Sequence, residues 1–465
     1  MPTPKTMLDK IWDSHFVAQR LDGRDMVYID RHVLHDLHAP HAFEKLQHTG
    51  RSVRRADLTF SMQDHTVATK PGRDETTNPD GAQFQRAMRE GSLRNGIRLF
   101  DLDDPEQGIS HVVAPELGLV LPGATHAVPD SHACTVGGLG ALGLGCGTSE
   151  LEHILATQTI ALKRPKCVRV TLEGALDRFV TAKDVALRIL ALFGTSFGRG
   201  AAIEFAGPVA RALSIEARMT LCNLAIEMGS RAGFVAPDDK TFAYLEGRPY
   251  APRGAERDAA IAQWRLLRSD EGARFDLELS VDCTGLAPQI TWGTDQAQTI
   301  GINESVPPVG TEALARVKAQ AALAYMGLEP GMPVAGLKVD RVFIGSCTNA
   351  RLSDLRAAAA IIKGKHAAPG LTAMVVPGST SVKRAAESEG LDLIFKDAGF
   401  FWGESGCSMC AGGNGDRGRP QERIVSTTNR NFEGRQGKGV RTHLASPEVA
   451  AATALTGVIA DPRRI

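Results

Sequence analysis

Strand-like and helix-like segments alternate through the last third of the chain, and this alternation most constrains the fold. Strand-like stretches at 339–344 and 373–377 are each followed by a helix-like stretch, at 352–363 and 382–389. Such alternation predicts an α/β structure with a parallel sheet and helices packed on its faces. Ligands of such sheets bind at the carboxyl ends of the strands. Cys347 lies three residues after the first stretch, so we expect its thiol at that edge.

Three cysteines predict a metal cluster there. Cys347 lies in the run Gly-Ser-Cys-Thr-Asn, and Cys407 and Cys410 form a Cys-x-x-Cys pair. Three thiolates can hold three corners of an iron–sulfur cube, whereas an electron-carrying cluster normally has four cysteine ligands. The fourth iron then keeps an open position and acts as a Lewis acid toward a substrate hydroxyl or carboxylate. The pattern therefore indicates a lyase or hydratase that depends on a 4Fe-4S cluster.

A Cys-x-x-Cys pair alone also fits a redox pair, a zinc half-site or two buried thiols. A zinc site would need a second such pair or a histidine-rich spacing, and the sequence has neither. A thioredoxin-like pair would begin a helix after a strand in a small domain, but this pair lies 55 residues before the last residue, among glycines. The remaining cysteines have no ligand-like spacing and are expected to be small buried hydrophobes: Cys134, Cys146, Cys167, Cys222 and Cys283.

Length and charge limit the class of protein. A chain of 465 residues exceeds one hydrophobic core, so two or three domains are expected. Lys and Arg total 53, as do Asp and Glu, which removes a general attraction to nucleic acid or anionic membrane. The sequence shows no signal-peptide core and no uncharged stretch long enough to cross a bilayer. Eight scattered cysteines favour a reducing cytoplasm, and small-molecule chemistry is the better expectation.

The middle of the chain continues the α/β pattern. Alternating apolar residues predict a strand at 167–172 and a second at 203–205, between helices at 182–192 and 219–228. Glycines are dense over 137–147, which lets the backbone approach a ligand or another segment closely. This run lacks the GxxxxGK[ST] order of a phosphate-binding loop, so that interpretation is rejected.

Seven motifs in a fixed order resemble those of the aconitase superfamily. They are Tyr28-Ile-Asp-Arg-His32, Asp64-His65, Pro129-Asp-Ser-His132, Thr220-Leu-Cys-Asn223 through Glu227, Gly345 to Asn349, Gly406 to Cys410 and Asn429-Arg-Asn-Phe-Glu-Gly-Arg435. Within it, Thr291 to Thr294 and Arg441 to Leu444 resemble the large subunits of isopropylmalate isomerases (3-isopropylmalate dehydratases). The resemblance covers nearly the whole chain.

The resemblance implies an aconitase-like three-domain α/β/α architecture with mixed and parallel sheets, lacking the swivelling fourth domain. The expected domains are 1–165, 166–285 and 286–465, and the last holds the cluster cysteines. It also implies isomerisation of 2-isopropylmalate and 3-isopropylmalate through 2-isopropylmaleate, in leucine biosynthesis.

Exchanging a hydroxyl between adjacent carbons requires the loss of a proton next to a carboxylate and the expulsion of hydroxide. An imidazolium that protonates the leaving hydroxyl turns it into water. Asp64 beside His65 fits this acid, because a neighbouring carboxylate favours the charged imidazole. A bare Asp-His pair is usually structural, but by resemblance this one matches the superfamily's acid.

The resemblance also implies a second set of polar residues: His111, Asp130, Ser131, His132, Asn223 and Glu227. By similarity, His132 pairs with Glu227, and Asp130 and His111 line the same pocket. Asn223 lies one helical turn before Glu227 and would share its face. Without the resemblance, these residues would be interpreted as polar side chains that hydrogen-bond to one another under a cleft.

Two arginines supply candidate substrate contacts. Arg430 and Arg435 carry planar guanidinium groups, which suit a dicarboxylate. By similarity, Asn429 is a residue close to the cluster. Ser346 and Asn349 are expected to hydrogen-bond around the first cysteine, or to form its turn. His32 and His35 are further candidate pocket residues.

The resemblance implies a partner. Single-chain aconitases have a C-terminal swivelling domain with a serine base and further arginines, and no matching segment follows Cys410. We therefore expect a separate small subunit to supply this part of the site, and the chain alone to be inactive or nearly so. Pro129 stands where the resembling enzymes have glycine; proline fixes φ and removes an N–H, which leaves the exact substrate open.

Three alternatives remain at this point. One is a paralogous hydro-lyase for citramalate, dimethylmalate, homocitrate or homoaconitate, or another alkylmalate. A second is an iron-responsive RNA-binding protein, which the neutral charge and the lack of aromatic-basic patches disfavour. A structural zinc protein is the weakest.

Overall fold

The computed structural model describes residues 3–410 and 412–465 and divides into two compact units. Unit 1 comprises Met1–Thr66, Gly81–Ala175 and Ser196–Cys283; unit 2 comprises Val67–Asp80, Leu176–Thr195 and Thr284–Ile465. None of the described helices is both long and apolar enough to cross a bilayer. The three-part division expected from the sequence stays a prediction.

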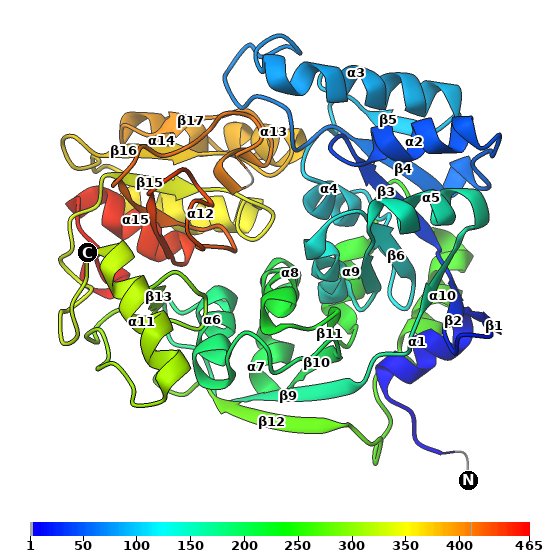
Figure 1. Cartoon of the computed structure of the whole chain (residues 1–465), viewed down its shortest axis with the longest axis horizontal. Helices are drawn as coiled ribbons and strands as arrows, with labels where there is room; N and C mark the ends of the chain where they lie inside the picture. Colours follow the sequence, from blue (N-terminus) through cyan, green and yellow to red (C-terminus); the bar gives the residue numbers. More distant parts are fainter. Residues whose placement is uncertain (1–2, 411) are drawn as a thin grey trace. The chain divides into compact units, whose positions relative to one another are not determined.

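Unit 1 contains a five-stranded sheet in the order β5-β4-β3-β6-β7, and every neighbouring pair is parallel (Figure 1). The strands are β3 (Arg31–His35), β4 (Thr59–Met62), β5 (Arg98–Phe100), β6 (Thr125–Val128) and β7 (Leu142–Gly145). The three central strands are almost entirely buried, as expected of a parallel sheet covered on both faces. Helices of this part of the chain include α1 (Met7–His15), α2 (Ala39–His48), α3 (Pro79–Arg94), α4 (Ser110–Glu116) and α5 (Thr148–Thr157).

A second parallel sheet of unit 1 has the order β11-β10-β9-β12. Its strands are β9 (Cys167–Glu173), β10 (Ala202–Ala206), β11 (Ala232–Val235) and β12 (Leu277–Asp282). The helices α7 (Gly207–Ala212) and α8 (Ile215–Asn223) follow β10 in the chain, and α9 (Asp239–Leu245) and α10 (Gly254–Trp264) follow β11. A small antiparallel sheet, β1-β2-β8, joins Phe16–Gln19, Asp25–Tyr28 and Thr159–Leu162.

The glycine-dense segment packs where side chains would not fit. It begins in the 3₁₀ helix η2 (Ser131–Leu139). A Cβ atom on Gly137 would lie 1.6 Å from the carbonyl oxygen of Gly233 in β11, and one on Gly143 would lie 2.0 Å from the carbonyl oxygen of Ala133. The glycines therefore let η2 lie directly against β7 and β11, which is the close backbone approach expected from the sequence.

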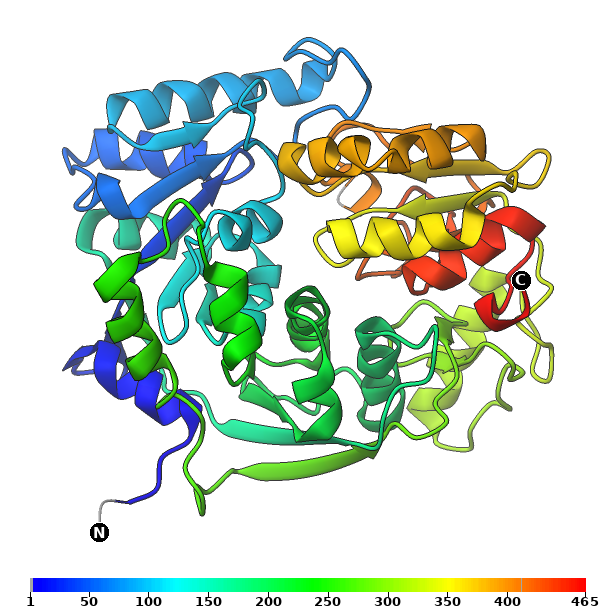
Figure 2. The same cartoon turned by 180° about the vertical axis from the view of Figure 1, so that it is seen from behind.

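Unit 2 contains the parallel sheet predicted from the alternating segments, with the order β17-β16-β15-β18-β19. Its strands are β15 (Arg341–Ile344), β16 (Thr372–Val375), β17 (Phe401–Trp402), β18 (Arg423–Ser426) and β19 (Arg441–Leu444). The helices α12 (Leu352–Ile362), α13 (Thr380–Ser388), α14 (Leu391–Asp397) and α15 (Pro447–Thr456) belong to the same unit. In Figure 2, α12 and α15 run side by side against this sheet. The predicted α/β fold is therefore confirmed.

The rest of unit 2 includes α6 (Ala182–Phe193), α11 (Ala313–Met326) and a two-stranded antiparallel sheet of β13 (Gln289–Thr291) and β14 (Thr299–Gly301). Two stretches singled out in the sequence, 291–294 and 441–444, meet here. The hydroxyl of Thr291 accepts a hydrogen bond from the amide of Leu444 at 2.7 Å, and His443 Nδ1 lies 2.6 Å from the Thr291 carbonyl oxygen.

Candidate active site

The predicted acid and its neighbours lie at the carboxyl edge of the unit 1 sheet. His35 ends β3, Asp64 follows β4 by two residues, and Asp130 follows β6 by two residues. These strands are adjacent and parallel. Loops at this edge of a parallel sheet converge, so three segments distant in sequence deliver polar side chains to one place.

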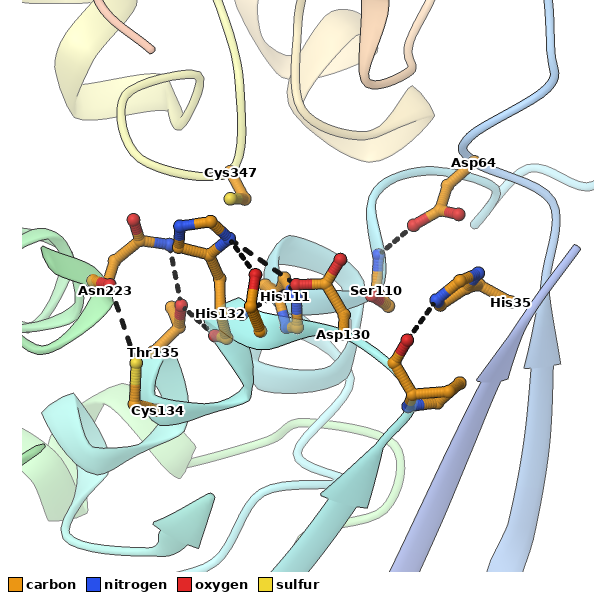
Figure 3. Close-up of polar contacts among 12 residues, drawn as sticks. His35, Asp64, Ser110, His111, Asp130, His132, Cys134, Thr135, Asn223 and Cys347 are labelled. Atoms are coloured by element: carbon orange, nitrogen blue, oxygen red, sulfur yellow. Dashed lines mark hydrogen bonds and ion pairs between the residues drawn. The ribbon is translucent and has the colours of Figure 1, made fainter. Parts of the chain in front are cut away.

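His65 lies between two carboxylates. Its Nδ1 is 2.5 Å from Asp64 Oδ1, and its Nε2 is 3.4 Å from Asp130 Oδ2. Asp64 Oδ2 also accepts the amide of Ser110 at 3.1 Å, at the start of α4 (Figure 3). Burial opposes the charged ring, but the two carboxylates prevail and raise the pKa of His65 well above its ordinary value. The pKa of Asp64 falls to about 2, because His65 outweighs the effect of burial.

Asp130 also joins this pair to two further histidines. Its Oδ1 lies 2.9 Å from His111 Nε2 and accepts the backbone amide of His132 at 2.7 Å (Figure 3). Burial would raise the pKa of Asp130, but hydrogen bonds from His111, His132 and His65 hold it well below its ordinary value. The carboxylate is therefore ionised at neutral pH.

His132 forms the second carboxylate-bound imidazole. Its Nε2 lies 3.0 Å from Glu227 Oε1, and its Nδ1 lies 3.5 Å from Asp130 Oδ1. Although burial opposes the charge, these carboxylates raise the pKa of His132 to about 9. Ser131 Oγ lies 3.3 Å from Nδ1 of the same ring.

The helix expected over 219–228 is interrupted. It ends as α8 at Asn223 and continues as the 3₁₀ helix η3 (Leu224–Met228), which closes at Gly229 with φ of 76°. The tighter winding removes the simple four-residue spacing between Asn223 and Glu227. Both side chains nevertheless contact η2: Asn223 Nδ2 donates to Thr135 Oγ1 at 2.8 Å, and Glu227 meets His132 (Figure 3).

Asp36 binds the backbone around His65. In the sequence, only its place directly after a strand set it apart. Its carboxylate accepts the amides of Asp64, His65 and Thr66 at 3.3, 3.0 and 2.7 Å. It is fully buried. Three successive N–H groups bind one carboxylate, so Asp36 stabilises this conformation of the loop that carries His65.

His35 supports the same loop from the other side. Its ring stacks on His65 with centroids 4.2 Å apart. Its Nε2 lies 2.8 Å from the carbonyl oxygen of Pro129, the contact marked by the dashed line at His35 in Figure 3. Burial lowers the pKa of His35 to about 3, so the ring is neutral. His32 is also fully buried, and burial lowers its pKa to about 3.

Ligand atoms of His35, Asp36, Asp64 and His65 all lie within 4.8 Å of one another, a spacing compatible with a metal ion. The hydrogen bonds already described occupy them instead: Asp36 binds amides, His35 binds a carbonyl, and the other two bind each other. This group is a hydrogen-bonded network that orients the acid.

The cysteine loops lie at the carboxyl edge of the unit 2 sheet. Cys347 follows β15 by three residues, and Asn429 follows the adjacent strand β18 by three. Asn429 Nδ2 donates to Cys347 Sγ, and its Oδ1 accepts from Cys410 Sγ, both at 3.5 Å. Ser346 Oγ lies 3.2 Å from Cys410 Sγ. One asparagine and one serine therefore bridge two of the three predicted ligands.

The Cys-x-x-Cys pair is fixed by its own middle residues. Met409 is fully buried in a core cluster with Phe343 and Ile424. Ser408 has φ of 49°, and its hydroxyl donates to Asp416 at 2.8 Å. The amide of Cys410 bonds to the carbonyl of Cys407 at 3.1 Å. The turn is thus anchored in the core of unit 2.

These three thiols fit an iron–sulfur cluster by the chemistry of the donor set. None of them forms a disulfide, all are less than 8% exposed, and Ser346 and Asn429 offer hydrogen bonds to their sulfurs. Hydrogen bonds to sulfur and burial are features by which proteins tune such clusters. The other five cysteines are also buried and form no disulfide, as expected.

The other candidates in unit 2 are Asn349, Arg430 and Arg435. Asn349 Nδ2 donates to Asp354 in the first turn of α12 at 3.0 Å. Arg430 and Arg435 are half-buried. Arg435 lines a cavity of about 660 Å³ together with Arg417 and Lys438. Its Nε has no hydrogen-bond partner among the described residues.

Lys183 is the residue of unit 2 that sequence reasoning missed. Its side chain is fully buried, and Nζ donates to the carbonyl oxygens of Thr427 and Thr428 at 2.5 Å each. The available signal was a lysine beside Asp184 in the first turn of a largely apolar helix. Such a lysine is rare unless it is paired.

Comparisons with known proteins show the family of the chain. The chain is 51% identical over 461 residues to "3-isopropylmalate dehydratase large subunit 1" from Bradyrhizobium diazoefficiens, covering 99% of this chain and 96% of that protein. It is also similar to the crystal structure of holo aconitase X from Thermococcus kodakaraensis, with 13% identity, a TM-score of 0.47 and coverage of 91% and 89% of the two chains. The model of the aconitase family (aconitate hydratase) matches residues 9–457. The chain therefore belongs to the aconitase family.

Proposed function

We propose that this chain is the cluster-bearing large subunit of a 3-isopropylmalate dehydratase, which isomerises 2-isopropylmalate and 3-isopropylmalate by dehydration and rehydration in leucine biosynthesis. The 51% identity to a relative of that name, over 99% of the chain, supports the substrate. The observation that best supports the chemistry is His65, held between Asp64 and Asp130 with a raised pKa. A protonated imidazole at neutral pH is what a leaving hydroxyl requires.

In this proposal His65 donates the proton from Nε2 while Asp64 holds Nδ1–H. Asp130 keeps the ring oriented through Nε2 in the resting state, at 3.4 Å. His111 and His132 hydrogen-bond to Asp130 from the other side and keep the carboxylate ionised, and Glu227 in turn holds the His132 ring. Ser131 and Asn223 are proposed substrate contacts of the same segments.

Cys347, Cys407 and Cys410 would hold a 4Fe-4S cluster through three thiolates, with Ser346, Asn349 and Asn429 around them. The cluster, when bound, supplies a Lewis-acid iron with an open position for a hydroxyl or carboxylate. Arg430 and Arg435 would bind substrate carboxylates in bidentate geometry.

A small subunit is the proposed partner, since the relative is named a large subunit. We expect it to supply the swivelling domain with the serine base, and the assembled enzyme to work in the cytoplasm.

The test is reconstitution under anaerobic conditions. The chain is assayed with rebuilt cluster, alone and with its small subunit, on 2-isopropylmalate, citramalate, dimethylmalate and homocitrate. We expect turnover of 2-isopropylmalate only in the assembled enzyme. Preference for another acid would contradict the proposed substrate. Full activity of the chain alone would contradict the proposed need for a small subunit.

Iron and sulfide content with spectroscopy tests the cofactor. The wild type should bind iron and sulfide, and Cys407→Ser should lose most of both. Cys283→Ser is the matched control, because this buried free thiol lies in unit 1 and has no proposed role. Zinc in place of iron in oxygen-free wild-type protein would contradict the cluster.

A further inference from the structure

Lys183 lies where a lysine is unfavourable. It occupies the first turn of α6 after the N-cap Thr181, where the helix presents its positive end. The side chain is fully buried, and burying an ammonium group costs several kcal/mol unless it is paired. Burial lowers the pKa of Lys183 to about 7, although nearby Asp354 and Cys410 oppose this effect.

The contacts of Lys183 lead to the cysteine loops. Nζ donates to the carbonyl oxygens of Thr427 and Thr428, which directly precede Asn429. The Asn429 side chain in turn contacts the sulfurs of Cys347 and Cys410, each at 3.5 Å. Lys183 is therefore separated from two predicted ligands by one fixed backbone segment.

Among the described residues, Nζ hydrogen-bonds to these two neutral carbonyl oxygens, whereas Asp354 and Asp184 attract it only from beyond ion-pair distance. A second buried cation lies beside the same loops. Arg351 is 3% exposed, donates from Nη1 to the carbonyl of Thr348 at 3.0 Å, and has no hydrogen-bond partner at Nε or Nη2 in the described chain. Neither cationic side chain forms an ion pair among the described residues, although Asp354 lies near both. A further anion can therefore compensate their charge in this part of unit 2.

We propose that Lys183 is a positioning and counter-charge residue for the cluster: it fixes the 427–429 segment against the cysteine sulfurs and offsets the negative charge that thiolates and a bound cluster bring. This inference rests on the proposed cofactor. Lys183 would thereby affect cluster retention and the redox midpoint potential, although it is neither a cluster ligand nor part of the proposed acid.

The test compares Lys183→Met with wild type and with Lys396→Met, an exposed lysine of the same unit that is paired with Asp392. Each large subunit is reconstituted anaerobically and assayed for iron and sulfide content, for the rate of iron loss in air, and for the midpoint potential by redox titration. Removing a cation disfavours the reduced, more negative cluster. We expect the ratio of reduced to oxidised cluster at a fixed potential to fall at least tenfold, a shift of about 59 mV.

We also expect Lys183→Met to lose iron several times faster in air, while Lys396→Met matches the wild type. Lys183→Arg keeps the charge and should retain most of the wild-type potential. Unchanged potential and iron loss in folded Lys183→Met would overturn the proposal. So would failure of both Lys183→Met and Lys183→Gln to fold without cluster, because the lysine would then be a structural cation. A wild type that binds no cluster would instead contradict the proposed function itself.

Discussion

The paired His132 and Glu227 give a prediction whose size follows from the structure. Glu227→Gln keeps the shape of the side chain and removes its charge, 3.0 Å from the ring. Asp130 remains, 3.5 Å from the other ring nitrogen. The substitution therefore removes one of the two carboxylates that favour the protonated ring.

The magnitude comes from the pKa of His132, which is about 9 instead of the usual 6.5. At about 1.36 kcal/mol for each pKa unit, the protonated ring stabilises the fold by about 3 kcal/mol. Because the folded-state pKa is raised, this contribution is complete below pH 6.5 and is lost as the pH rises through 9. If Glu227 supplies about half of it, Glu227→Gln should lower the free energy of unfolding by about 1.5 kcal/mol at pH 6 and by close to zero above pH 9.5.

Two measurements on the large subunit alone check this. Urea unfolding at pH 6 and at pH 9.5 gives the difference in stability, and NMR of ¹⁵N-histidine-labelled protein gives the pKa of His132. We expect that pKa to fall by about 1 unit in Glu227→Gln. Glu329→Gln, at an exposed position of unit 2, is the control and should change neither quantity.

An equal loss of stability at both pH values would refute the reasoning, because the effect would then come from packing and not from charge. A His132 that titrates near 6.5 in the wild type would also refute it.

Three further predictions concern other parts of the molecule. Met409→Ala removes a fully buried side chain between the two cysteines and should lower the free energy of unfolding by about 2–5 kcal/mol in urea titrations; a change under about 1 kcal/mol would show that the turn is not anchored by the core. Gly137→Ala would place a Cβ 1.6 Å from a backbone oxygen and should destabilise the chain by about 1–3 kcal/mol or more, while Gly310→Ala, in open space, should not. His65→Gln in the assembled enzyme should reduce kcat about 10²–10⁴-fold without loss of bound iron, and near-normal turnover would remove His65 from the role of acid.

Local patterns in the sequence predicted much of the architecture. The alternating segments between 339 and 389 predicted the strands and helices around β15, with boundaries within two or three residues of those observed. They therefore also predicted the edge of the sheet where Cys347 lies. These predictions succeed because hydrophobic periodicity reports burial over a few neighbouring residues. The prediction of a single helix over 219–228 was wrong in detail, because no strong pattern in the sequence marks the 3₁₀ winding after Asn223.

The sequence predicted only those contacts of the candidate site that lie within a short motif. Asp64 and His65 are neighbours in the chain, so their pairing could be anticipated from the dipeptide. Asp36, in contrast, binds amides 28 to 30 residues away, and no local pattern marks that contact. The same holds for His35, which reaches Pro129 across 94 residues.

The sequence alone determined the class of fold, and it predicted the three thiols of the candidate cluster site and the Asp-His dipeptide proposed as the acid, since each depends on residue type and short spacing. Only the tertiary structure decided which carboxylates contact His65 and His132, and which cation binds the segment next to the cysteines. Lys183 meets Thr427 and Thr428 across 244 and 245 residues. The pKa of each group depends on such neighbours and on burial, and both arise only when distant strands deliver their loops to one edge of a sheet.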